Sequence, residues 1–358
     1  MSSSLIAALP ARYVLDGDSG SGGFSDVFYC NDIHLDRRVA IKTIRDTSES
    51  KRLNDEVAAL LQLRSKHVVQ VFDIIRNDDF FGIIMEYING EDLFQSKYHT
   101  RTNIHLLKVL WQIASGIADI HDAGLIHRDI KPNNMKLDSE NIVKIFDFGL
   151  SRSTGSDAVT VGFVGTPGFS APEQFTHDEV AFTSAVDVYA FGIMALYLAT
   201  GNIPTILRTM PPGRMPVGAF NCDYLNSFPI LQLLFERCLE HAFDDRPSIY
   251  EIRDEIGKYL LFNKHQAIAV MDGRSHVLNS SVRRVQLGLG SIGSFEIHYD
   301  GFNFLLQNVV GEVFVNNSPA QSNNKIPGAC VVGLGERGRH YSDRRFVTFD
   351  VSNPEVTL

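Results

Sequence analysis

The stretch His127-Arg128-Asp129-Ile130-Lys131-Pro132-Asn133-Asn134, followed by Asp147-Phe148-Gly149, decides the interpretation of this chain. It brings two carboxylates, an amide and a lysine into one short, ordered span. Carboxylate and amide oxygens are hard ligands of the kind that Mg²⁺ prefers, and a carboxylate can also accept a proton from a hydroxyl group. Two such motifs in this order, each flanked by strand-like apolar residues, indicate one shared site.

Length and composition give the general class of protein. At 358 residues the chain exceeds the size at which one hydrophobic core usually stops growing, so two domains are expected. Hydrophobic residues make up 44% and charged residues 21%, which is typical of a globular protein. The net charge of -9 and the absence of a Lys/Arg run argue against nucleic acid as the main partner.

The N-terminus and the cysteines suggest a location. The first ten residues lack the basic region and the longer apolar stretch of a secretory signal. The most apolar segment, 185–198, carries Asp187 and is too short to span a membrane, so we expect a buried helix there and no membrane span. The four cysteines form no Cys-x-x-Cys pair and are expected to be reduced thiols, so we expect a cytoplasmic protein.

The periodicity of apolar residues changes along the chain. Residues 11 to 90 alternate short β-branched and aromatic runs with turns, interrupted by one helical stretch at about 49–64, which predicts a small sheet with one helix. Helices are expected from Asn103 to Gly124 and at about 183–200, 229–241 and 248–262. Ser248 and Glu251 form a possible capping box for the last of these helices. Beyond about 263, strands are expected at 294–299, 302–307, 312–315 and 346–351.

The N-terminal part contains features suited to a nucleotide. Gly20-Ser21-Gly22-Gly23-Phe24-Ser25-Asp26-Val27 is a glycine-rich turn whose backbone N–H groups can approach phosphate oxygens, with Phe24 at its tip. Val39-Ala40-Ile41-Lys42 then places a lysine on a strand, where it can pair with phosphates. Glu56 is the predicted partner of Lys42, although Glu49, Asp55 and Glu56 could all be solvated helix charges.

From about Tyr13 to about Phe262, the chain resembles the eukaryotic-like Ser/Thr protein kinase family. The matching features run in order: the glycine loop, Lys42, Glu56, Met85-Glu86-Tyr87, the stretch around Asp129, Asp147-Phe148-Gly149, Ala171-Pro172-Glu173, Asp187 and Arg246. The resemblance implies a bilobal α+β fold, with a small β-rich lobe and a mainly helical lobe, that transfers the γ-phosphoryl group of ATP to serine or threonine hydroxyls of proteins.

The resemblance also implies a role for each residue. Asp129 would accept the proton of the acceptor hydroxyl, Lys131 would offset charge on the phosphoryl group, and Asn134 and Asp147 would ligate Mg²⁺. The nucleotide would contact Gly20, Ser21, Gly22, Gly23, Phe24, Val27, Ala40, Lys42, Glu56, Met85, Glu86, Tyr87 and Ile88. Glu173 would pair with Arg246, and Asp187 would hold the backbone around Asp129.

The segment between Asp147 and Glu173 resembles a kinase activation segment. It carries Ser151, Ser153, Thr154, Ser156, Thr160 and Thr166. Arg128 could bind a phosphorylated residue in this segment, so autophosphorylation is expected, with Thr160 a modest favourite. Thr166 is instead expected to contact Asp129 and Lys131. Two positions depart from the family: Ser25 replaces a glycine, and Lys136 replaces an apolar residue below the adenine ring.

Residues from about 291 to 355 resemble a forkhead-associated domain, a β-sandwich that binds phosphothreonine peptides. The Ser-Arg-x-His signature of that family is absent, so Arg274, Arg283 or Arg284 would have to substitute, and a purely structural sandwich is the alternative. We therefore expect an N-terminal extension at 1–12, a kinase domain at 13–262 with lobes meeting near 87, a linker at 263–280 and a β-rich domain at 281–358.

Three functions compete. The expected one is an active kinase that uses ATP and Mg²⁺ on protein substrates, with a phosphoprotein or other partner at the C-terminal domain. A pseudokinase scaffold is disfavoured because Lys42, Glu56, Asp129, Asn134 and Asp147 are all present. A small-molecule kinase is disfavoured by the Ala171-Pro172-Glu173 motif.

Overall fold

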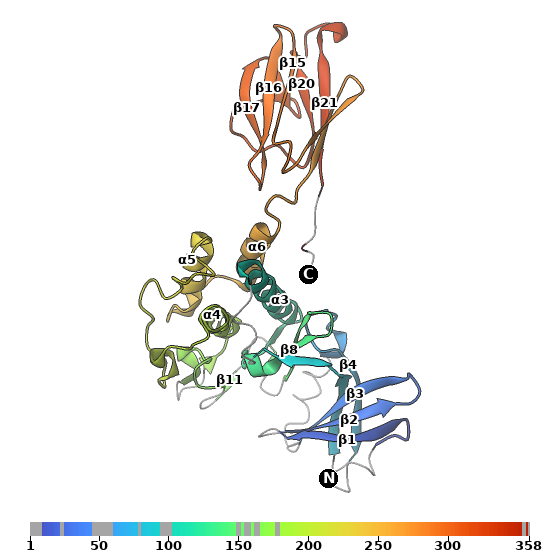
Figure 1. The fold of residues 1–358 in the computed structure, drawn as a ribbon, viewed down its shortest axis with the longest axis vertical. Helices are drawn as coiled ribbons and strands as arrows, with labels where there is room; N and C mark the ends of the chain where they lie inside the picture. The colour runs from blue at the N-terminus through green and yellow to red at the C-terminus, as the bar shows by residue number, and fades with distance from the viewer. Residues whose placement is uncertain are drawn as a thin grey trace. The chain divides into compact units, whose positions relative to one another are not determined.

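The structure is a computed structural model that describes residues 9–21, 25–44, 60–77, 80–93, 102–147, 152–153, 159–160, 165–175, 180–352 and 356. The chain divides into two compact units, Met1–Ile256 with Leu358, and Gly257–Thr357 (Figure 1). The boundary falls within helix α6 (Ile249–Leu260). Each unit has its own hydrophobic core, as the two-domain expectation from chain length requires.

The first unit begins with a five-stranded antiparallel sheet of order β1-β2-β3-β5-β4. Its strands are β1 (Tyr13–Ser21), β2 (Ser25–Asp32), β3 (Arg37–Ile44), β4 (Val71–Asn77) and β5 (Phe80–Glu86). Inward residues such as Cys30, Val39, Ile41 and Ile84 are fully buried, because β-branched and other apolar residues alternate along these strands. The predicted small sheet is present. Of the predicted helix at about 49–64 only residues 60–64 are described, of which 60–62 are helical.

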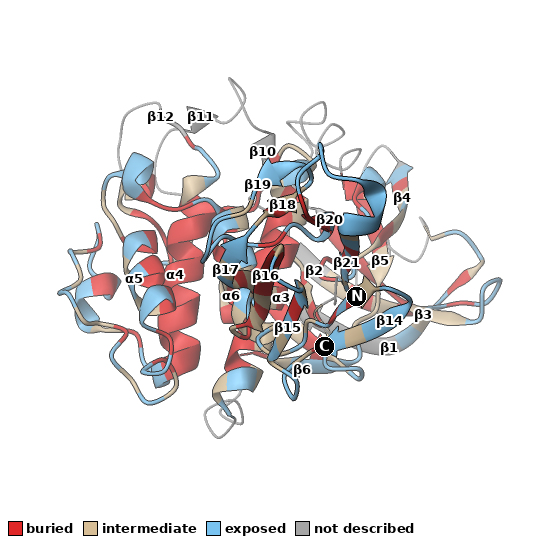
Figure 2. Ribbon diagram, turned by 90° about the horizontal axis from the view of Figure 1, so that it is seen from above, coloured by how far each residue is buried: buried red, intermediate tan, exposed pale blue. Residues whose placement is uncertain are grey.

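Helices make up most of the rest of the first unit. They are α3 (Asn103–Asp122), α4 (Ala185–Thr200), α5 (Pro229–Cys238) and α6 (Ile249–Leu260), with short 3₁₀ turns η2 (Pro132–Asn134), η4 (Pro172–Phe175), η5 (Thr205–Arg208) and η6 (Phe243–Asp245). The α-helices were all predicted. Helix α4 is apolar on every side and is buried almost throughout, as Figure 2 shows.

Two helix ends follow the sequence signals. The hydroxyl of Ser248 accepts a hydrogen bond from the backbone N–H of Glu251 at 3.1 Å. The carboxylate of Glu251 pairs with Arg237 at 3.0 Å, so only one of the two hydrogen bonds of a capping box is present in the described structure. Helix α4 ends at Gly201, whose left-handed backbone (φ 74°) suits glycine.

Small sheets complete the first unit. A three-stranded sheet has the order β6-β8-β9, formed by β6 (Gly90–Asp92), β8 (Met135–Asp138) and β9 (Val143–Ile145). Two pairs join β7 (Leu125–Ile126) to β10 (Arg152–Ser153) and β11 (Val159–Thr160) to β12 (Val180–Ala181). The β8–β9 hairpin positions the predicted metal ligands. Within the described residues no helix combines the length and apolar character needed to cross a membrane.

The second unit contains two antiparallel sheets. The first has six strands in the order β14-β13-β21-β20-β18-β19 and the second has three in the order β15-β16-β17. The bounds are β13 (Ala267–Met271), β14 (Arg274–Leu278), β15 (Arg284–Leu289), β16 (Gly293–Tyr299), β17 (Phe304–Gly311), β18 (Val313–Val315), β19 (Ser318–Pro319), β20 (Ala329–Leu334) and β21 (Arg345–Val351), with the 3₁₀ turn η7 (Tyr341–Asp343).

One hydrophobic cluster unites the two sheets of the second unit. Phe295, Phe304 and Phe349 come from β16, β17 and β21 and are almost completely buried. The rings of Phe304 and Phe349 lie 5.7 Å apart, and the ring of Tyr299 stacks on Phe304 at 4.6 Å. The C-terminal region is therefore all-β, as expected.

The start of the C-terminal domain in the structure differs from the start that the sequence predicted. Residues 263–280, expected to be a linker, carry β13 and β14 and belong to the six-stranded sheet. Ala267 and Ala269 supply the buried side of β13. Alanine has a low β-propensity, and the short run Ala267–Met271 gave no strand signal.

Candidate active site

The β8–β9 hairpin brings the two predicted metal ligands to one end of a small sheet. Asn134 ends the turn η2 directly before β8, and Asp147 follows β9 after one intervening residue. The hairpin loop is closed by Asp138, whose carboxylate accepts hydrogen bonds from the backbone N–H groups of Glu140 and Ile142, both at 2.9 Å. Phe146 N–H donates to the carbonyl of Asn134 at 3.0 Å, which couples the two ends.

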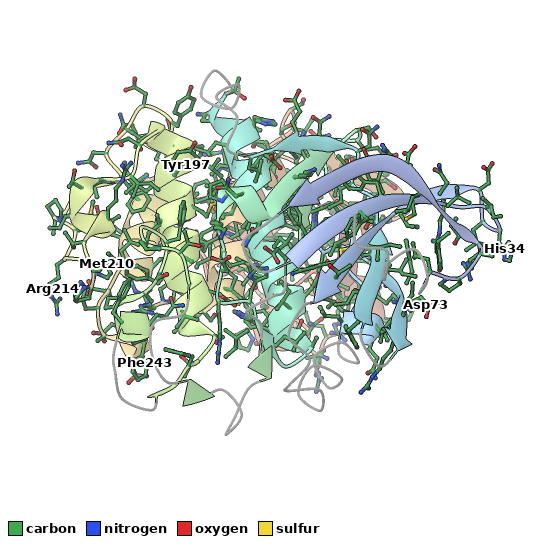
Figure 3. All side chains as sticks on the ribbon, turned by 90° about the horizontal axis from the view of Figure 1, so that it is seen from below. His34, Asp73, Tyr197, Met210, Arg214 and Phe243 are labelled. Carbon is green, nitrogen blue, oxygen red and sulfur yellow. The ribbon has the colours of Figure 1, made fainter. Side chains whose placement is uncertain are left out.

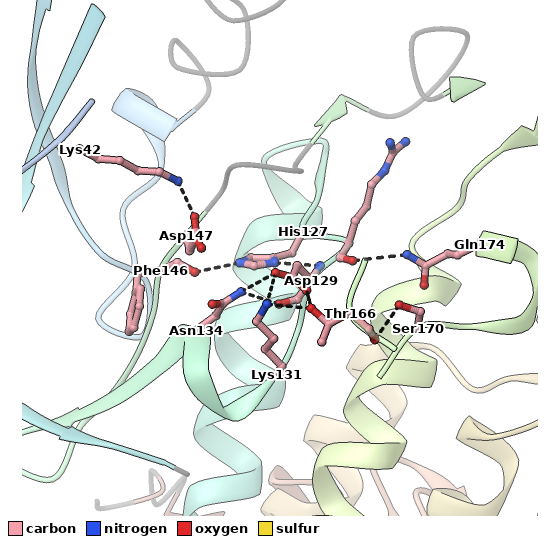
Figure 4. A network of polar contacts seen from close by, with 11 residues as sticks. Lys42, His127, Asp129, Lys131, Asn134, Phe146, Asp147, Thr166, Ser170 and Gln174 are labelled. Carbon is pink, nitrogen blue, oxygen red and sulfur yellow. Dashed lines mark hydrogen bonds and ion pairs between the residues drawn. The ribbon is translucent and has the colours of Figure 1, made fainter. Parts of the chain in front are cut away.

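Asp129 lies at the centre of a group of polar side chains (Figure 4). Its carboxylate accepts hydrogen bonds from Lys131 Nζ at 2.6 Å, Asn134 Nδ2 at 2.9 Å and Thr166 Oγ1 at 2.6 Å. Lys131 Nζ also donates to Thr166 Oγ1 at 2.8 Å. The contact of Thr166 with both residues was expected, and the hydrogen bonds confirm it. Burial and this set of donors hold the Asp129 carboxylate in one orientation.

Lys42 from β3 reaches the same site from the five-stranded sheet. Its ammonium group forms an ion pair with the carboxylate of Asp147, as the dashed line in Figure 4 shows. Burial alone would raise the pKa of Asp147, but Lys42 as a charge and as a hydrogen-bond donor, with His127 and Lys131 nearby, brings the pKa below its usual range. Asp147 is therefore ionised at neutral pH. Glu56, the predicted partner of Lys42, lies outside the described residues.

A buried aspartate on α4 holds the backbone before Asp129. The carboxylate of Asp187 accepts hydrogen bonds from the N–H groups of His127 at 2.9 Å and Arg128 at 2.7 Å, and it contacts the His121 ring at 2.9 Å. Burial would raise the pKa of Asp187, yet the hydrogen bonds and charges of His121 and His127 lower it overall. This backbone role was expected for Asp187, and the contacts confirm it.

A second framework contact joins η4 to the chain before α6. Arg246 donates two parallel hydrogen bonds to the carboxylate of Glu173, at 2.7 and 2.8 Å, as expected from the sequence. It also donates to the carbonyls of Ala185 and Glu240. A buried arginine needs such a complete set of acceptors, because an unpaired buried charge is costly.

Two residues of the site adopt a backbone conformation that is unusual for them. Arg128 and Asp147 both have φ of 67°, in the left-handed region that non-glycine residues rarely occupy. The hydrogen bonds of Asp187 hold Arg128 there. Such conformations persist where the surrounding contacts determine them, and they often mark functional sites.

The predicted nucleotide residues lie on neighbouring strands where they are described. Gly20 pairs with Val27 across β1 and β2, and Val27 pairs with Lys42 across β2 and β3. Ala40 is buried and pairs with Met85 across β3 and β5. Ser21 ends β1. The loop tip Gly22, Gly23 and Phe24 lies outside the described residues.

The segment Met85–Ile88 includes the last two residues of β5 and the two residues after it. The carboxylate of Glu86 pairs with Lys144 of β9 at 2.9 Å, and Glu86 N–H donates to the carbonyl of Gln70 at 2.8 Å. The Tyr87 hydroxyl accepts a hydrogen bond from Arg38 at 2.7 Å. Both side chains therefore make protein contacts, which leaves the backbone carbonyl of Glu86 and the segment through Ile88 as the candidate contact for a base.

Gln174 is a framework residue that the sequence did not reveal. It is buried, accepts a hydrogen bond from the N–H of Ala171 at 2.7 Å and donates to the carbonyl of Arg128 at 3.4 Å (Figure 4). It thereby connects the segment after Thr166 with the backbone of Arg128. Its position directly after Ala171-Pro172-Glu173 was the only available signal.

The donor set around Asp147 fits a magnesium ion. The Asp147 carboxylate is ionised, and Asn134 donates through Nδ2 to the carbonyl and carboxylate of Asp129, so its Oδ1 can act as a ligand. Two hard oxygen ligands with water and phosphate oxygens make a usual magnesium site. Within the described residues no group of three or more His, Cys, Asp or Glu side chains could hold a metal alone.

Comparison with known proteins agrees with this site. Residues 13–255 match the family model described as the protein kinase domain. The chain is 34% identical over 207 residues to the Serine/threonine-protein kinase PrkC of Bacillus subtilis, covering 55% of this chain and 31% of that protein. It is 35% identical over 209 residues to PknA, a serine/threonine-protein kinase of Corynebacterium glutamicum, covering 54% and 44%.

A plant protein gives a longer match. The CBL-interacting serine/threonine-protein kinase 18 of Arabidopsis thaliana is 29% identical over 255 residues, covering 68% of this chain and 49% of that protein. The chain thus spans between 31% and 49% of the length of these curated relatives. Because the family model covers more than half of it, the chain belongs to the protein kinase family. The relatives it resembles are of the serine/threonine class.

Proposed function

We propose that the chain is an ATP-dependent protein kinase that transfers the γ-phosphoryl group to serine and threonine hydroxyls of proteins. The observation that carries this proposal is the convergence of Asp129, Lys131 and Asn134 from the catalytic loop with Lys42 and Asp147. The family match and the names of the relatives support it.

In this proposal, Asp129 accepts the proton of the acceptor hydroxyl. The hydroxyl of Thr166 already donates to Asp129 Oδ1 at 2.6 Å, which is the geometry that a substrate hydroxyl needs for proton transfer. Lys131, bonded to Asp129 Oδ2, lies where an ammonium group can offset negative charge on the migrating phosphoryl group. The serine or threonine oxygen forms the new P–O bond as the bond to ADP breaks.

Lys42 and the glycine-rich turn hold the phosphates in this proposal. Lys42 would contact the α- and β-phosphates, with Glu56 as its partner, while Gly20 through Phe24 supply backbone N–H groups. Val27 and Ala40 would line the adenine site, and the backbone of Glu86 to Ile88 would bind its edge, with Met85 behind it. Asn134 and Asp147 would hold Mg²⁺, which neutralises charge on the phosphates when bound.

Measuring label transfer from ATP in the presence of magnesium tests this function. We expect Asp129→Asn to lower the transfer rate by about 10²- to 10⁴-fold, the usual contribution of a general base. Asp254→Asn, which alters an exposed aspartate on α6, is the control and should keep full activity. Equal transfer by the Asp129→Asn variant and the original chain would remove the role assigned to Asp129.

We also propose that the kinase phosphorylates its own activation segment, between Asp147 and Glu173. Arg128 supports this, because its side chain carries a cation directly before Asp129 and lies over the Phe182 ring at 4.9 Å. Mapping phosphosites after incubation with ATP tests it, with Thr160 the expected position. Phosphosites confined to other parts of the chain would contradict this proposal.

For the second unit we propose a recruitment role, as a forkhead-associated-like domain. Arg283 donates to Asn263 at 2.8 Å and Arg284 pairs with Glu296 at 3.4 Å, so both already have partners. Arg274 of β14 is exposed and is the better candidate for a phosphate contact. The test is whether the full chain binds a phosphothreonine peptide. Binding that is lost in the Arg274→Ala variant supports the recruitment role. If the original chain does not bind the peptide, recognition of phosphothreonine by this unit is contradicted.

The state of the cysteines supports a proposal about the cellular compartment of the chain. Cys30, Cys222, Cys238 and Cys330 are free thiols. Burial raises the pKa of Cys30 to about 11, so this thiol is not a reactive thiolate at neutral pH. Free cysteines of this kind suit a reducing compartment, and we propose the cytoplasm.

A further inference from the structure

An exposed arginine lies beside the segment that leads away from Asp129. Gly168 follows Thr166 by two residues, is buried, and has φ of 93°. A Cβ atom at Gly168 would lie 3.8 Å from Cγ of Arg208, and no other heavy atom would come within 4 Å. Part of the aliphatic side chain of Arg208 therefore lies beside Gly168.

The short turn that carries Arg208 is held in place by its neighbours. Leu207 of η5 is 1% exposed, which anchors the turn in the core of the first unit. Thr209 Oγ1 donates to the carbonyls of Ile206 and Pro211 at 2.8 and 2.9 Å, and Gly213 N–H donates to Ile206 O at 2.9 Å. The backbone of Arg208 is thus fixed, while its side chain is exposed.

The guanidinium of Arg208 has no hydrogen bond or ion pair within the described ranges. Arg214 in the same loop differs, because it pairs weakly with Glu240 at 3.8 Å and its side chain is 72% exposed. Figure 3 shows Arg214 and Met210 at the edge of the molecule. Guanidinium groups bind carboxylates and phosphates through parallel hydrogen bonds.

The position of Arg208 in the chain fold is relevant to how an acceptor peptide would bind. The hydroxyl of Thr166 donates to Asp129, and Gly168, which lies beside Arg208, follows two residues later, so Arg208 is close in the chain to the place where an acceptor hydroxyl would meet Asp129. A peptide residue rises by about 3.3 Å, so an extended peptide that ran from Asp129 past Gly168 would bring side chains within three residues of the acceptor to Arg208.

We infer that Arg208 selects acceptor peptides that carry an anionic side chain, a carboxylate or a phosphate, within three residues of the phosphorylated serine or threonine. This inference rests on the proposed kinase function and adds the substrate class to it. Arg208 is a specificity residue in this inference and takes no part in phosphoryl transfer.

Peptides with a single threonine acceptor test it. Aspartate, phosphoserine or asparagine is placed in turn at each of the three positions on either side, and kcat/KM is measured. At one position the original chain should prefer aspartate to asparagine by about three- to fivefold, the usual size of an exposed ion pair. The phosphoserine series shows whether a carboxylate or a phosphate is the better ligand.

The variants identify the residue responsible. Arg208→Ala should remove the preference, and Arg208→Glu should replace it with a preference for lysine at the same position. Arg214→Ala, which makes the same charge change in the same loop, should retain the original preference. A preference that is unchanged in Arg208→Ala, or the lack of any preference in the original chain, overturns the inference.

A peptide-binding experiment tests the role of Arg208 separately from the proposed kinase function. Fluorescence anisotropy of the same labelled peptides is measured with the full chain carrying Asp129→Asn, so that no turnover is needed. If no peptide is phosphorylated but binding still depends on Arg208, the proposed function fails and the inference stands. If peptides are phosphorylated and neither rate nor binding depends on Arg208, the inference fails and the function stands.

Discussion

Both units of this protein have a hydrophobic core, but they differ in the polar groups that they bury. The first unit surrounds Asp129 with buried polar groups, including Asp187 and Arg246, each of which has several fixed partners. The second unit has an apolar core around Phe304 and Phe349, and its ion pairs, such as Glu312 with Arg339, are partly exposed. Buried polar networks are costly to build, so their concentration in one unit indicates where precise positioning is needed.

The comparison predicts that truncation of a core aromatic ring strongly destabilises the second unit. Phe349→Ala should lower the free energy of unfolding of the second unit by about 3 to 5 kcal/mol, because it leaves a cavity in the core. Phe346→Ala on the same strand is the control, since Phe346 is 51% exposed and Phe349 is 2% exposed. Denaturant unfolding followed by hydrogen exchange of each unit measures this, and a loss confined to the first unit would contradict the comparison.

In the first unit, we expect a large loss of stability when a buried ion pair is broken. Arg246→Ala should cost about 3 kcal/mol of stability, because the Glu173 carboxylate loses both arms of its partner. Arg237→Ala, which removes an exposed pair with Glu251, should cost less than about 1 kcal/mol. Urea unfolding of both variants measures the difference, and equal losses would show that burial does not distinguish the two pairs.

Acid should affect the two units in different pH ranges. Burial lowers the pKa of His67 to about 4. The neutral ring therefore contributes on the order of 3 kcal/mol to the stability of the first unit above pH 6.5, and this contribution disappears as the pH falls from 6.5 to 4. Hydrogen bonds from Arg339 and the N–H of Glu336 lower the pKa of Glu312 to about 2, so its contribution disappears only between about 4.5 and 2.

Unfolding measured at a series of pH values checks this order. His67→Gln should make the unfolding free energy of the first unit less dependent on pH between 6.5 and 4. Glu312→Gln should leave the pH dependence in that range unchanged. Loss of the second unit before the first on acidification would show that other groups dominate.

The smallest expected effect is a loss of activity with no loss of stability. Thr166→Val removes the hydrogen bonds of Thr166 to Asp129 and Lys131 and should lower kcat/KM by about tenfold, the value of one hydrogen bond to a charged group. Thr348→Val, on the exposed face of β21, is the matched control and should leave the rate unchanged. A rate loss in both variants, or in neither, would separate Thr166 from catalysis.

Much of the first unit could be predicted because its chemistry is local in sequence. The order of Asp129, Lys131, Asn134 and Asp147, and the apolar periodicity of α3 to α6, gave the fold class and the candidate site. The contacts of Thr166, Asp187 and Arg246 followed from the resemblance to kinases. These residues stand in the order along the chain that the kinase family shares.

The rest depended on contacts between distant segments. Gln174 and Arg208 belong to no chemical pattern, and only the fold brings them to Arg128 and Gly168. The pairing of Lys42 with Asp147 could not be read from the chain either, since charge alone allowed several partners. In the second unit β13 was missed because buried alanines carry little hydrophobic or β-strand signal.

The end of α6 has a practical consequence for anyone who shortens this protein. The ring of Phe302 lies against Tyr259 at 5.9 Å and Phe262 at 4.8 Å, and Asn263 N–H donates to the carbonyl of Gly301. Stopping the chain at residue 262, where the catalytic motifs suggest a natural end, would strip these aromatic rings of their cover and invite aggregation. A fragment ending there would differ from the full chain for a reason unrelated to the candidate active site.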